Sequence, residues 1–175
     1  MGKKRVAFFT AVAVLVGILP ALCAPTGTMP AAKVRVGTYN TRMVALAYWR
    51  SAEGMKVIGA TVNDAMAAKK AGEKEKAAEL EKKAKDLQRR LHNEVFGNSP
   101  IPEVTEAMKS ALNEVAQAKD VVAIVPEVAY AGDSVDVVDV TEEIVAKCKP
   151  TEQTRRVLNE LPKHPPAEME VIGAD

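Results

Sequence analysis

The chain has 175 residues, with 24 basic and 23 acidic side chains, a formal net charge of +1 and an aromatic content of 4%. This nearly neutral charge argues against a nucleic-acid partner, because such proteins present a strongly basic surface. With so few large side chains the core is small, so we expect strands to be buried against sister subunits in an oligomer.

Residues 1–24 are predicted to be a signal peptide, because Lys3, Lys4 and Arg5 precede an uncharged apolar stretch that ends at Ala24. Its removal leaves 21 basic and 23 acidic residues. The stretch is also just long enough to cross a bilayer, so a retained inner-membrane anchor is the alternative. A lipoprotein is less favoured, because the large Leu22 precedes Cys23. We expect a periplasmic protein with a turn-rich leader over residues 25–32.

The N-terminal half is predicted to be one strand followed by helices. Residues 34–39 alternate in polarity and are rich in β-branched side chains, and Asn40 or Thr41 can cap a short helix. Residues 55–95 are rich in Ala, Lys, Glu and Leu and lack proline, which predicts a helical arm. One apolar stripe runs through Ile58, Val62 and Met66 and another through Leu80, Leu87 and Leu91, and the pattern fails at Gly72.

The lengths of these helices favour a hairpin. A single helix over 55–95 would extend ~60 Å, whereas a helix over 103–118 would return only ~24 Å, at about 1.5 Å per residue. We therefore expect the arm to reverse near Gly72. A straight helix, with the sheet strands supplied by different chains, is the alternative.

In the C-terminal half, residues 96–102 are predicted to be a loop, and Pro102 suits the first turn of a helix over 103–118. The apolar run 121–125 predicts a buried strand. Asp139 or Thr141 begins a helix over 141–149. Residues 150–175 contain four prolines and scattered charges, so a disordered tail is expected. The predicted fold class is α+β and mainly helical, a small β-sheet body with a protruding, coiled-coil-like helical hairpin.

Residues 33–149 resemble the Skp/OmpH family of periplasmic chaperones. The most specific part is the apolar strand 121–125, followed by Tyr130, by Asp139-Val140-Thr141 and by Ile144. This resemblance implies an OmpH-like homotrimer whose arms hold unfolded outer-membrane or envelope proteins as an ATP-independent holdase. The arm is shorter than is usual in the family, the loop 96–102 interrupts the returning helix, and the tail is additional.

The candidate client-binding residues lie on the predicted arm. Residues 69–92 carry nine basic and five acidic side chains, which can attract acidic chains or an anionic membrane surface. The alternative is that the stripe packs inside the hairpin and the lysines form a solvated face. The candidates are Val62, Met66, Lys69, Lys70, Lys74, Lys76, Leu80, Leu87 and Leu91.

Catalysis, metal binding and a cofactor find little support in the sequence. His92 and His164 have no partner at a recognisable spacing, and Cys148 lacks an assignable histidine. The aspartates near residue 136 lack the glycine and glutamate spacing of a calcium loop. We therefore expect a protein that is not an enzyme. A membrane-anchored or exported helical scaffold without chaperone activity is the competing function.

Overall fold

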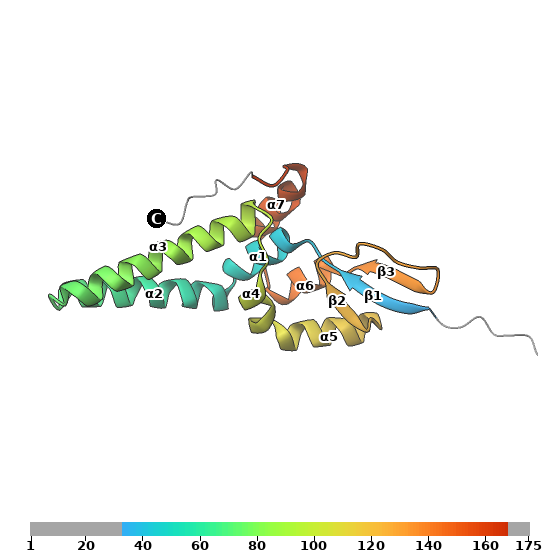
Figure 1. Cartoon of the computed structure of the whole chain (residues 1–175), viewed down its shortest axis with the longest axis horizontal. Coiled ribbons are helices and arrows are strands. Elements are labelled where there is room, and N and C mark those ends of the chain that lie inside the picture. Colours follow the sequence, from blue (N-terminus) through green and yellow to red (C-terminus); the bar gives the residue numbers. More distant parts are fainter. Residues whose placement is uncertain (1–32, 168–175) are drawn as a thin grey trace, which may run out of the picture. The chain divides into compact units, whose positions relative to one another are not determined.

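The computed structural model describes residues 33–167, which belong to one compact unit of the chain (Figure 1). Along this part of the chain, three short strands form one sheet and helices make up most of the rest. The predicted α+β, mainly helical class is confirmed. The predicted signal peptide 1–24, the leader 25–32 and the last eight residues of the predicted tail lie outside the described residues.

The sheet has β1 (Val34–Thr38) in the centre, flanked by β2 (Ala123–Val125) and β3 (Val135–Asp139), and both neighbours run parallel to β1. The sequence analysis missed β3. It was also wrong to expect a buried strand over 121–125, because β2 is a short edge strand and the adjacent Val122 is 74% exposed.

One face of the sheet packs on the core through a row that contains Gly37, with Ile124 and Val138 opposite it on either side. A Cβ atom on Gly37 would lie 3.1 Å from Val140 Cγ2 and 3.3 Å from Ile124 Cγ1. Glycine therefore lets β1 approach these side chains closely. On the other face Val34 is 49% and Val137 42% exposed.

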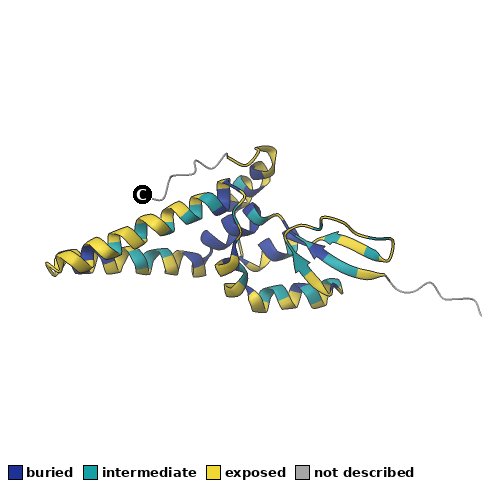
Figure 2. Ribbon diagram, viewed as in Figure 1, coloured by how far each residue is buried: buried dark blue, intermediate teal, exposed yellow. Residues whose placement is uncertain are grey.

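Helix α1 (Thr41–Trp49) forms the centre of the core, where Figure 2 shows buried residues concentrated. Every residue from Arg42 to Trp49 is buried, as expected of a helix that is apolar on nearly all sides. The side-chain oxygen of Asn40 accepts a hydrogen bond from Met43 N at 3.1 Å, which confirms the predicted cap. Because α1 contacts α2, α3, α6 and α7, it fixes the starting point of the hairpin.

Helices α2 (Ala52–Lys70) and α3 (Lys74–Phe96) contact each other and lead away from α1 as a hairpin (Figure 1). The chain reverses at Gly72, whose φ of +76° is strained for residues with a side chain. The straight helix is therefore excluded. Helix α2 begins earlier than expected, because Ser51 caps it through Gly54 N at 3.2 Å.

The helix expected over 103–118 is two helices, α4 (Pro102–Ala107) and α5 (Lys109–Lys119), which meet at Met108. Pro102 lies in the first turn of α4, as predicted. Helix α6 (Thr141–Lys147) is shorter than the expected 141–149. Asp139 Oδ1 accepts a hydrogen bond from Thr141 N at 2.8 Å, so the predicted start of this helix is confirmed.

The prediction of a disordered tail from residue 150 is wrong for its described part. Helix α7 (Glu152–Glu160) and the 3-10 turn η1 (Leu161–Lys163) follow, and Thr154, Leu158 and Leu161 are buried. Two of the four prolines that suggested disorder, Pro150 and Pro162, lie just outside the ends of α7, where proline is compatible with a helix boundary.

The side chain of Arg42 forms hydrogen bonds to both this C-terminal segment and helix α3 of the hairpin. Its Nε donates to Val95 O at 3.1 Å and its Nη1 donates to His164 O at 2.9 Å. The guanidinium therefore lies near the C-terminal end of α3, where the helix carbonyls carry partial negative charge. This contact explains how a buried arginine is accommodated.

Candidate functional site

The contact between α2 and α3 is made by small side chains toward the tip and by larger ones toward the base. Ala65, Ala68 and Ala77 are buried although only two helices meet there. Three leucines of the predicted client-binding set are half-buried, and two of them pack against the core. The leucines therefore pack within the hairpin and at its base; they are Leu80, Leu87 and Leu91.

Helix α2 has a second apolar face that points away from α3. Met55 is 55%, Val62 37% and Met66 63% exposed. Gly59 lies on the same face, and a Cβ atom placed on it would have no atom of the described chain within 4 Å. We call Met55, Gly59, Val62 and Met66 the outer seam. The sequence interpretation had joined Ile58 to Val62 and Met66, but Ile58 packs toward the core.

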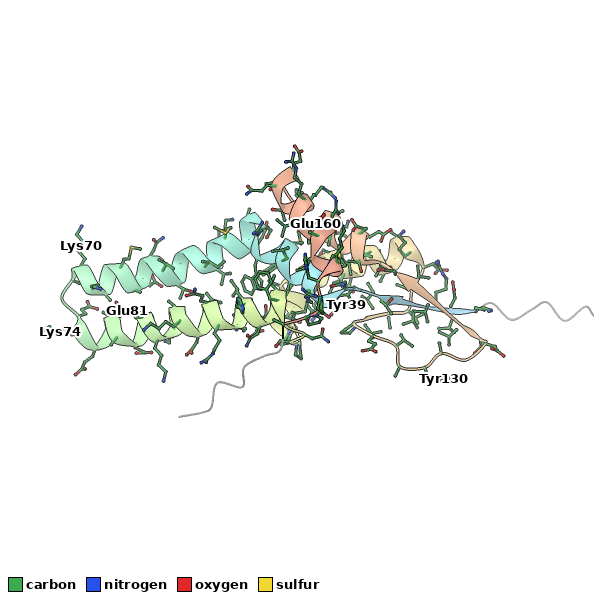
Figure 3. All side chains as sticks on the ribbon, turned by 90° about the horizontal axis from the view of Figure 1, so that it is seen from above. Tyr39, Lys70, Lys74, Glu81, Tyr130 and Glu160 are labelled. Carbon is green, nitrogen blue, oxygen red and sulfur yellow. The ribbon has the colours of Figure 1, made fainter. Side chains whose placement is uncertain are left out.

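The lysines of the hairpin differ in whether they have an acidic partner. Lys69 pairs with Glu81 across the two helices at 3.4 Å, and Lys76 pairs with Glu73 at 2.8 Å. Lys83 pairs with Glu79 at 2.7 Å. Four further lysines between residues 69 and 92 have no ion pair with a described residue, and Figure 3 places two of them, Lys70 and Lys74, at the tip. The unpaired basic residues between 69 and 92 are Lys70, Lys74, Lys82 and Lys85.

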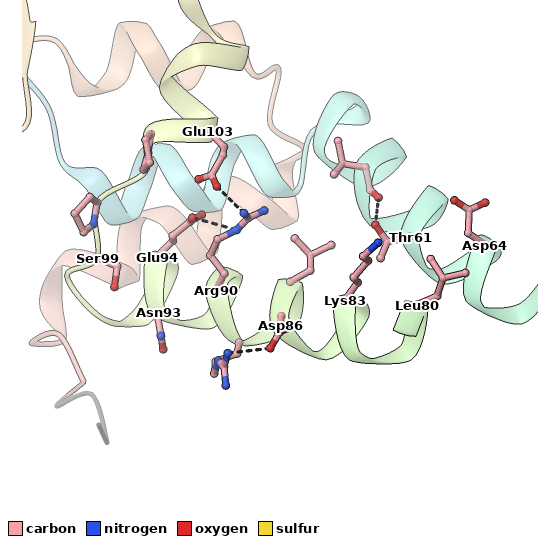
Figure 4. A pocket seen from close by; sticks show the side chains of 15 residues that line it. Thr61, Asp64, Leu80, Lys83, Asp86, Arg90, Asn93, Glu94, Ser99 and Glu103 are labelled. Atoms are coloured by element: carbon pink, nitrogen blue, oxygen red, sulfur yellow. Dashed lines mark hydrogen bonds and ion pairs between the residues drawn. The ribbon is translucent and has the colours of Figure 1, made fainter. Parts of the chain in front are cut away.

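At the base of the hairpin a carboxyl group is buried against α1. Glu94 is 1% exposed, and its Oε2 accepts a hydrogen bond from Trp49 Nε1 at 2.6 Å. Arg90 shares its guanidinium between Glu103, at 2.7 Å, and Glu94, at 3.7 Å (Figure 4). Burial raises the pKa of Glu94, against the opposing effects of the Trp49 hydrogen bond and the Arg90 charge.

A cleft of about 910 Å³ opens beside this carboxyl group, between the hairpin and the start of α4 (Figure 4). Leu80 and Leu87 supply part of its apolar lining. The charged groups around it alternate in sign, and Arg89 pairs with Asp86 at 2.8 Å. The cleft therefore lacks the single-sign lining that would select a cation or an anion.

The residues that carry the family resemblance lie apart from the hairpin. Val140, Thr141 and Ile144 are buried, and Thr141 Oγ1 accepts a hydrogen bond from Asn40 N at 2.9 Å. Asp139 Oδ1 accepts a hydrogen bond from the first amide of α6, whereas Tyr130 is 86% exposed on the loop between β2 and β3. The junction of sheet and helices is stabilised by Asp139, Val140, Thr141 and Ile144, whereas Tyr130 does not contribute to the buried core.

The candidate nucleophile, Cys148, and the candidate bases, His92 and His164, lie on different segments of the chain. His92 is exposed on α3 with its ring 5.0 Å from that of Phe96, and His164 is exposed after η1. Cys148 is buried with its Sγ 3.7 Å from Met108 Sδ, and burial raises its pKa to about 11. No catalytic pair is formed by these three residues.

Neither a metal site nor a membrane-spanning helix is found among residues 33–167. Within this range no three metal-ligating side chains gather in one place. No helix in the same range combines the length and the apolar character needed to cross a bilayer.

Comparison of the chain with protein-family models, with curated proteins and with solved structures returned no match. The resemblance to Skp/OmpH proteins therefore stays a prediction.

Sequence reasoning missed Met55 and Gly59, although their spacing to Val62 and Met66 is helical and could have identified the seam. It also missed the contact of Trp49 with Glu94. No local pattern joins these two residues, because they meet only when α3 folds back onto α1.

Proposed function

We propose that the protein is an exported, ATP-independent holdase that binds unfolded outer-membrane or envelope proteins. The observation that carries this proposal is the open apolar face of α2 beside unpaired lysines at the hairpin tip. Met66 is 63% exposed, and Lys70 follows it by one helical turn. A surface of this kind can hold a chain that exposes apolar segments, without any chemical step.

The residue types of this surface suit weak binding of varied chains. Methionine is flexible and polarizable, so Met66 can pack against side chains of different shapes. The cationic tip adds attraction that acts over about one Debye length and falls as salt is added. The proposed client-binding residues are Val62, Met66, Lys69, Lys70, Lys74 and Lys76, whereas Leu80, Leu87 and Leu91 support the hairpin from inside.

A homotrimeric assembly is part of the proposal. The outer face of the sheet carries Val34 and Val137, each more than two-fifths exposed, and both edge strands are short. Burying this valine face between subunits would remove apolar surface from water. The basic tips of such an assembly could also touch an anionic membrane surface.

The test is protection of an unfolded outer-membrane protein from aggregation, followed by light scattering after dilution from urea. We expect the native protein to suppress aggregation at one trimer per client. The Val62→Gln/Met66→Gln variant should protect less because the apolar contact is lost. Lys70→Gln/Lys74→Gln should reduce the salt dependence of protection.

Two matched controls lie away from this surface. Val57→Gln replaces an exposed valine on another side of α2, and Arg155→Gln removes an exposed charge from α7. Both should protect like the native protein. Absence of protection by the native protein at stoichiometric trimer would refute the holdase proposal.

An exported or membrane-anchored helical scaffold is the second candidate. It is favoured by the inward packing of Leu87 and Leu91, which leaves the hairpin only a narrow apolar surface for clients. Mass spectrometry of the protein purified from its host distinguishes an exported, processed protein from a membrane-anchored one. An N-terminus between about residues 22 and 33 indicates a processed protein, whereas Met1 or Gly2 indicates a retained anchor.

A further inference from the structure

We propose that the outer seam of α2 docks a preformed amphipathic helix of a partner protein, with acidic residues flanking the partner's apolar face. The inference rests on the proposed function only in treating α2 as a binding surface. It goes beyond that function because a folded helix is a different ligand from an unfolded chain.

The spacing of the seam is that of a helix-packing surface. Met55, Gly59, Val62 and Met66 are separated by four, three and four positions, which is the spacing of the apolar residues in a heptad repeat. The face that packs on α3 is separate and includes the buried Ala65 and Ala68. Helix α2 therefore has one partner inside the hairpin and the surface for a second.

Gly59 is the residue in this seam that the chain's own packing does not explain. Glycine inside a helix costs about 1 kcal/mol relative to alanine. Apart from the adjoining residues and the backbone of its own helix, no described atom lies within 4 Å of the position of a Cβ, so no packing neighbour in residues 33–167 excludes a side chain there. Its absence leaves a shallow gap between Met55 and Val62, into which a partner's apolar side chain fits.

The charges beside the seam select an acidic partner. At roughly 100° per residue, Lys56, Lys69 and Lys70 lie within about 100° of the seam. Lys69 already pairs with Glu81 on α3, so the preference for an acidic partner rests on Lys56 and Lys70. The two acidic residues of α2, Glu53 and Asp64, lie on the far side by the same measure. A second copy of α2 would bring lysines against lysines, so the complement is a different helix with glutamates or aspartates beside its apolar face.

The test uses two synthetic helical peptides of about four heptads with identical leucine seams. One carries glutamate and the other lysine at the flanking positions, and binding to the full chain is measured by fluorescence anisotropy. We expect the acidic peptide to bind and the basic peptide to bind at least about tenfold more weakly. Equal binding of the two peptides, or binding of neither, overturns the inference.

Variants of the full chain separate seam contact from charge attraction. Met55→Gln/Met66→Gln should weaken binding of the acidic peptide by about tenfold or more, because both side chains are apolar contacts. Gly59→Lys places a bulky chain in the gap and also adds a positive charge. Seam docking predicts weaker binding of the acidic peptide by this variant, and tighter binding would overturn the inference in favour of charge attraction alone.

Val57→Gln is the control, since Val57 is 42% exposed but lies outside the seam, and it should bind like the native chain. Aggregation assays on the same preparations separate this inference from the proposed function. Protection of an unfolded client without peptide binding overturns the docking inference alone. Peptide binding without protection overturns the holdase alone.

Discussion

At the scale of single residues, the carboxyl group of Glu94 is the most unusual titratable group in the described chain. It is buried at the base of the hairpin, where only the Trp49 indole donates a hydrogen bond to it. Its Oε1 and the neighbouring Arg90 Nε are buried without hydrogen-bond partners among the described residues. A charge in this position is poorly solvated, so its ionisation should be visible in the stability of the protein.

Burial raises the pKa of Glu94 above the value of 4.5 that is usual for an exposed glutamate. Because the folded state disfavours the charged form, the free energy of unfolding falls as the pH rises from about 4.5 through the raised pKa. Glutamine cannot ionise, so we expect the Glu94→Gln variant to gain stability relative to the native chain across this window. Urea denaturation near pH 4 and near pH 7 measures the change.

The matched control is Glu106→Gln on α4, since the side chain of Glu106 is 75% exposed. This variant should keep the pH dependence of stability that Glu94 gives the native chain. If Glu94→Gln keeps the same pH dependence, Glu94 is not the group that couples pH to folding.

Cys148 should be unreactive in the folded protein. The thiolate is the reactive form, and burial raises the pKa of this thiol to about 11, so little thiolate exists near neutral pH. We expect slow labelling by an aromatic disulfide reagent in buffer and rapid labelling in guanidinium chloride. Peptide mapping identifies the labelled residue, and fast labelling of Cys148 without denaturant would contradict its burial.

At the scale of elements, replacing each of the two glycines of α2 by alanine should change the free energy of unfolding in opposite directions. A Cβ atom on Gly54 would lie 2.3 Å from Tyr48 O and 2.7 Å from Trp49 Cα, which are backbone atoms that cannot move aside. We expect Gly54→Ala to lower the free energy of unfolding by about 1–3 kcal/mol. Gly59→Ala should raise it by about 1 kcal/mol, because its Cβ enters open space. Urea denaturation of both variants checks the two signs, and effects of the same sign would refute the proposed difference in packing.

Helix α7 provides a second test at this scale. Leu158 is 2% exposed, so Leu158→Ala should lower the free energy of unfolding by about 2–5 kcal/mol. Arg155→Ala, at an exposed position of the same helix, should change it by less than about 0.5 kcal/mol. Thermal or urea unfolding gives both values, and equal small effects would mean that α7 does not pack on the core.

The features that sequence reasoning located are those with a local signature. Gly72 was identified as the turn because it interrupts an apolar stripe, and Asn40, Pro102 and Asp139 were identified from the chemistry of helix ends. Strand β3 was missed because its pairing with β1 joins segments far apart in the sequence and its aspartates were weighed only as calcium ligands. Helix α7 was missed because its apolar residues are few and prolines lie near both ends.

The candidate site was predictable only in part, because exposure is decided by packing. Met66 and Lys70 were predicted as surface contacts, and the structure leaves both exposed. Leu87 was predicted from the same periodicity but is partly buried against the core. A helical period identifies an apolar face but does not say whether that face meets another helix or water.

At the scale of the whole molecule, the sheet offers a test of assembly. Val34 and Val137 are exposed on its outer face, and we propose that this face is covered in a trimer. Light scattering on a size-exclusion column should give a mass near three subunits. Val34→Lys/Val137→Lys should give a folded monomer, because two lysines per chain would have to be desolvated at the interface. A monomeric native protein would mean that the valine face is not a subunit interface.

The position of β1 in the sheet also sets an order of events in time. Val36 pairs with Ala123 and Val34 pairs with Val135, so the central strand has no neighbouring strand until residue 125 has been synthesised, and the sheet is complete only after residue 139. The hairpin around Gly72 is local and can form within microseconds once its residues are available. Contacts between distant segments close more slowly. We therefore expect α2 and α3 to expose their binding surface before the sheet exists, which makes the hairpin the first part of this protein able to meet a partner.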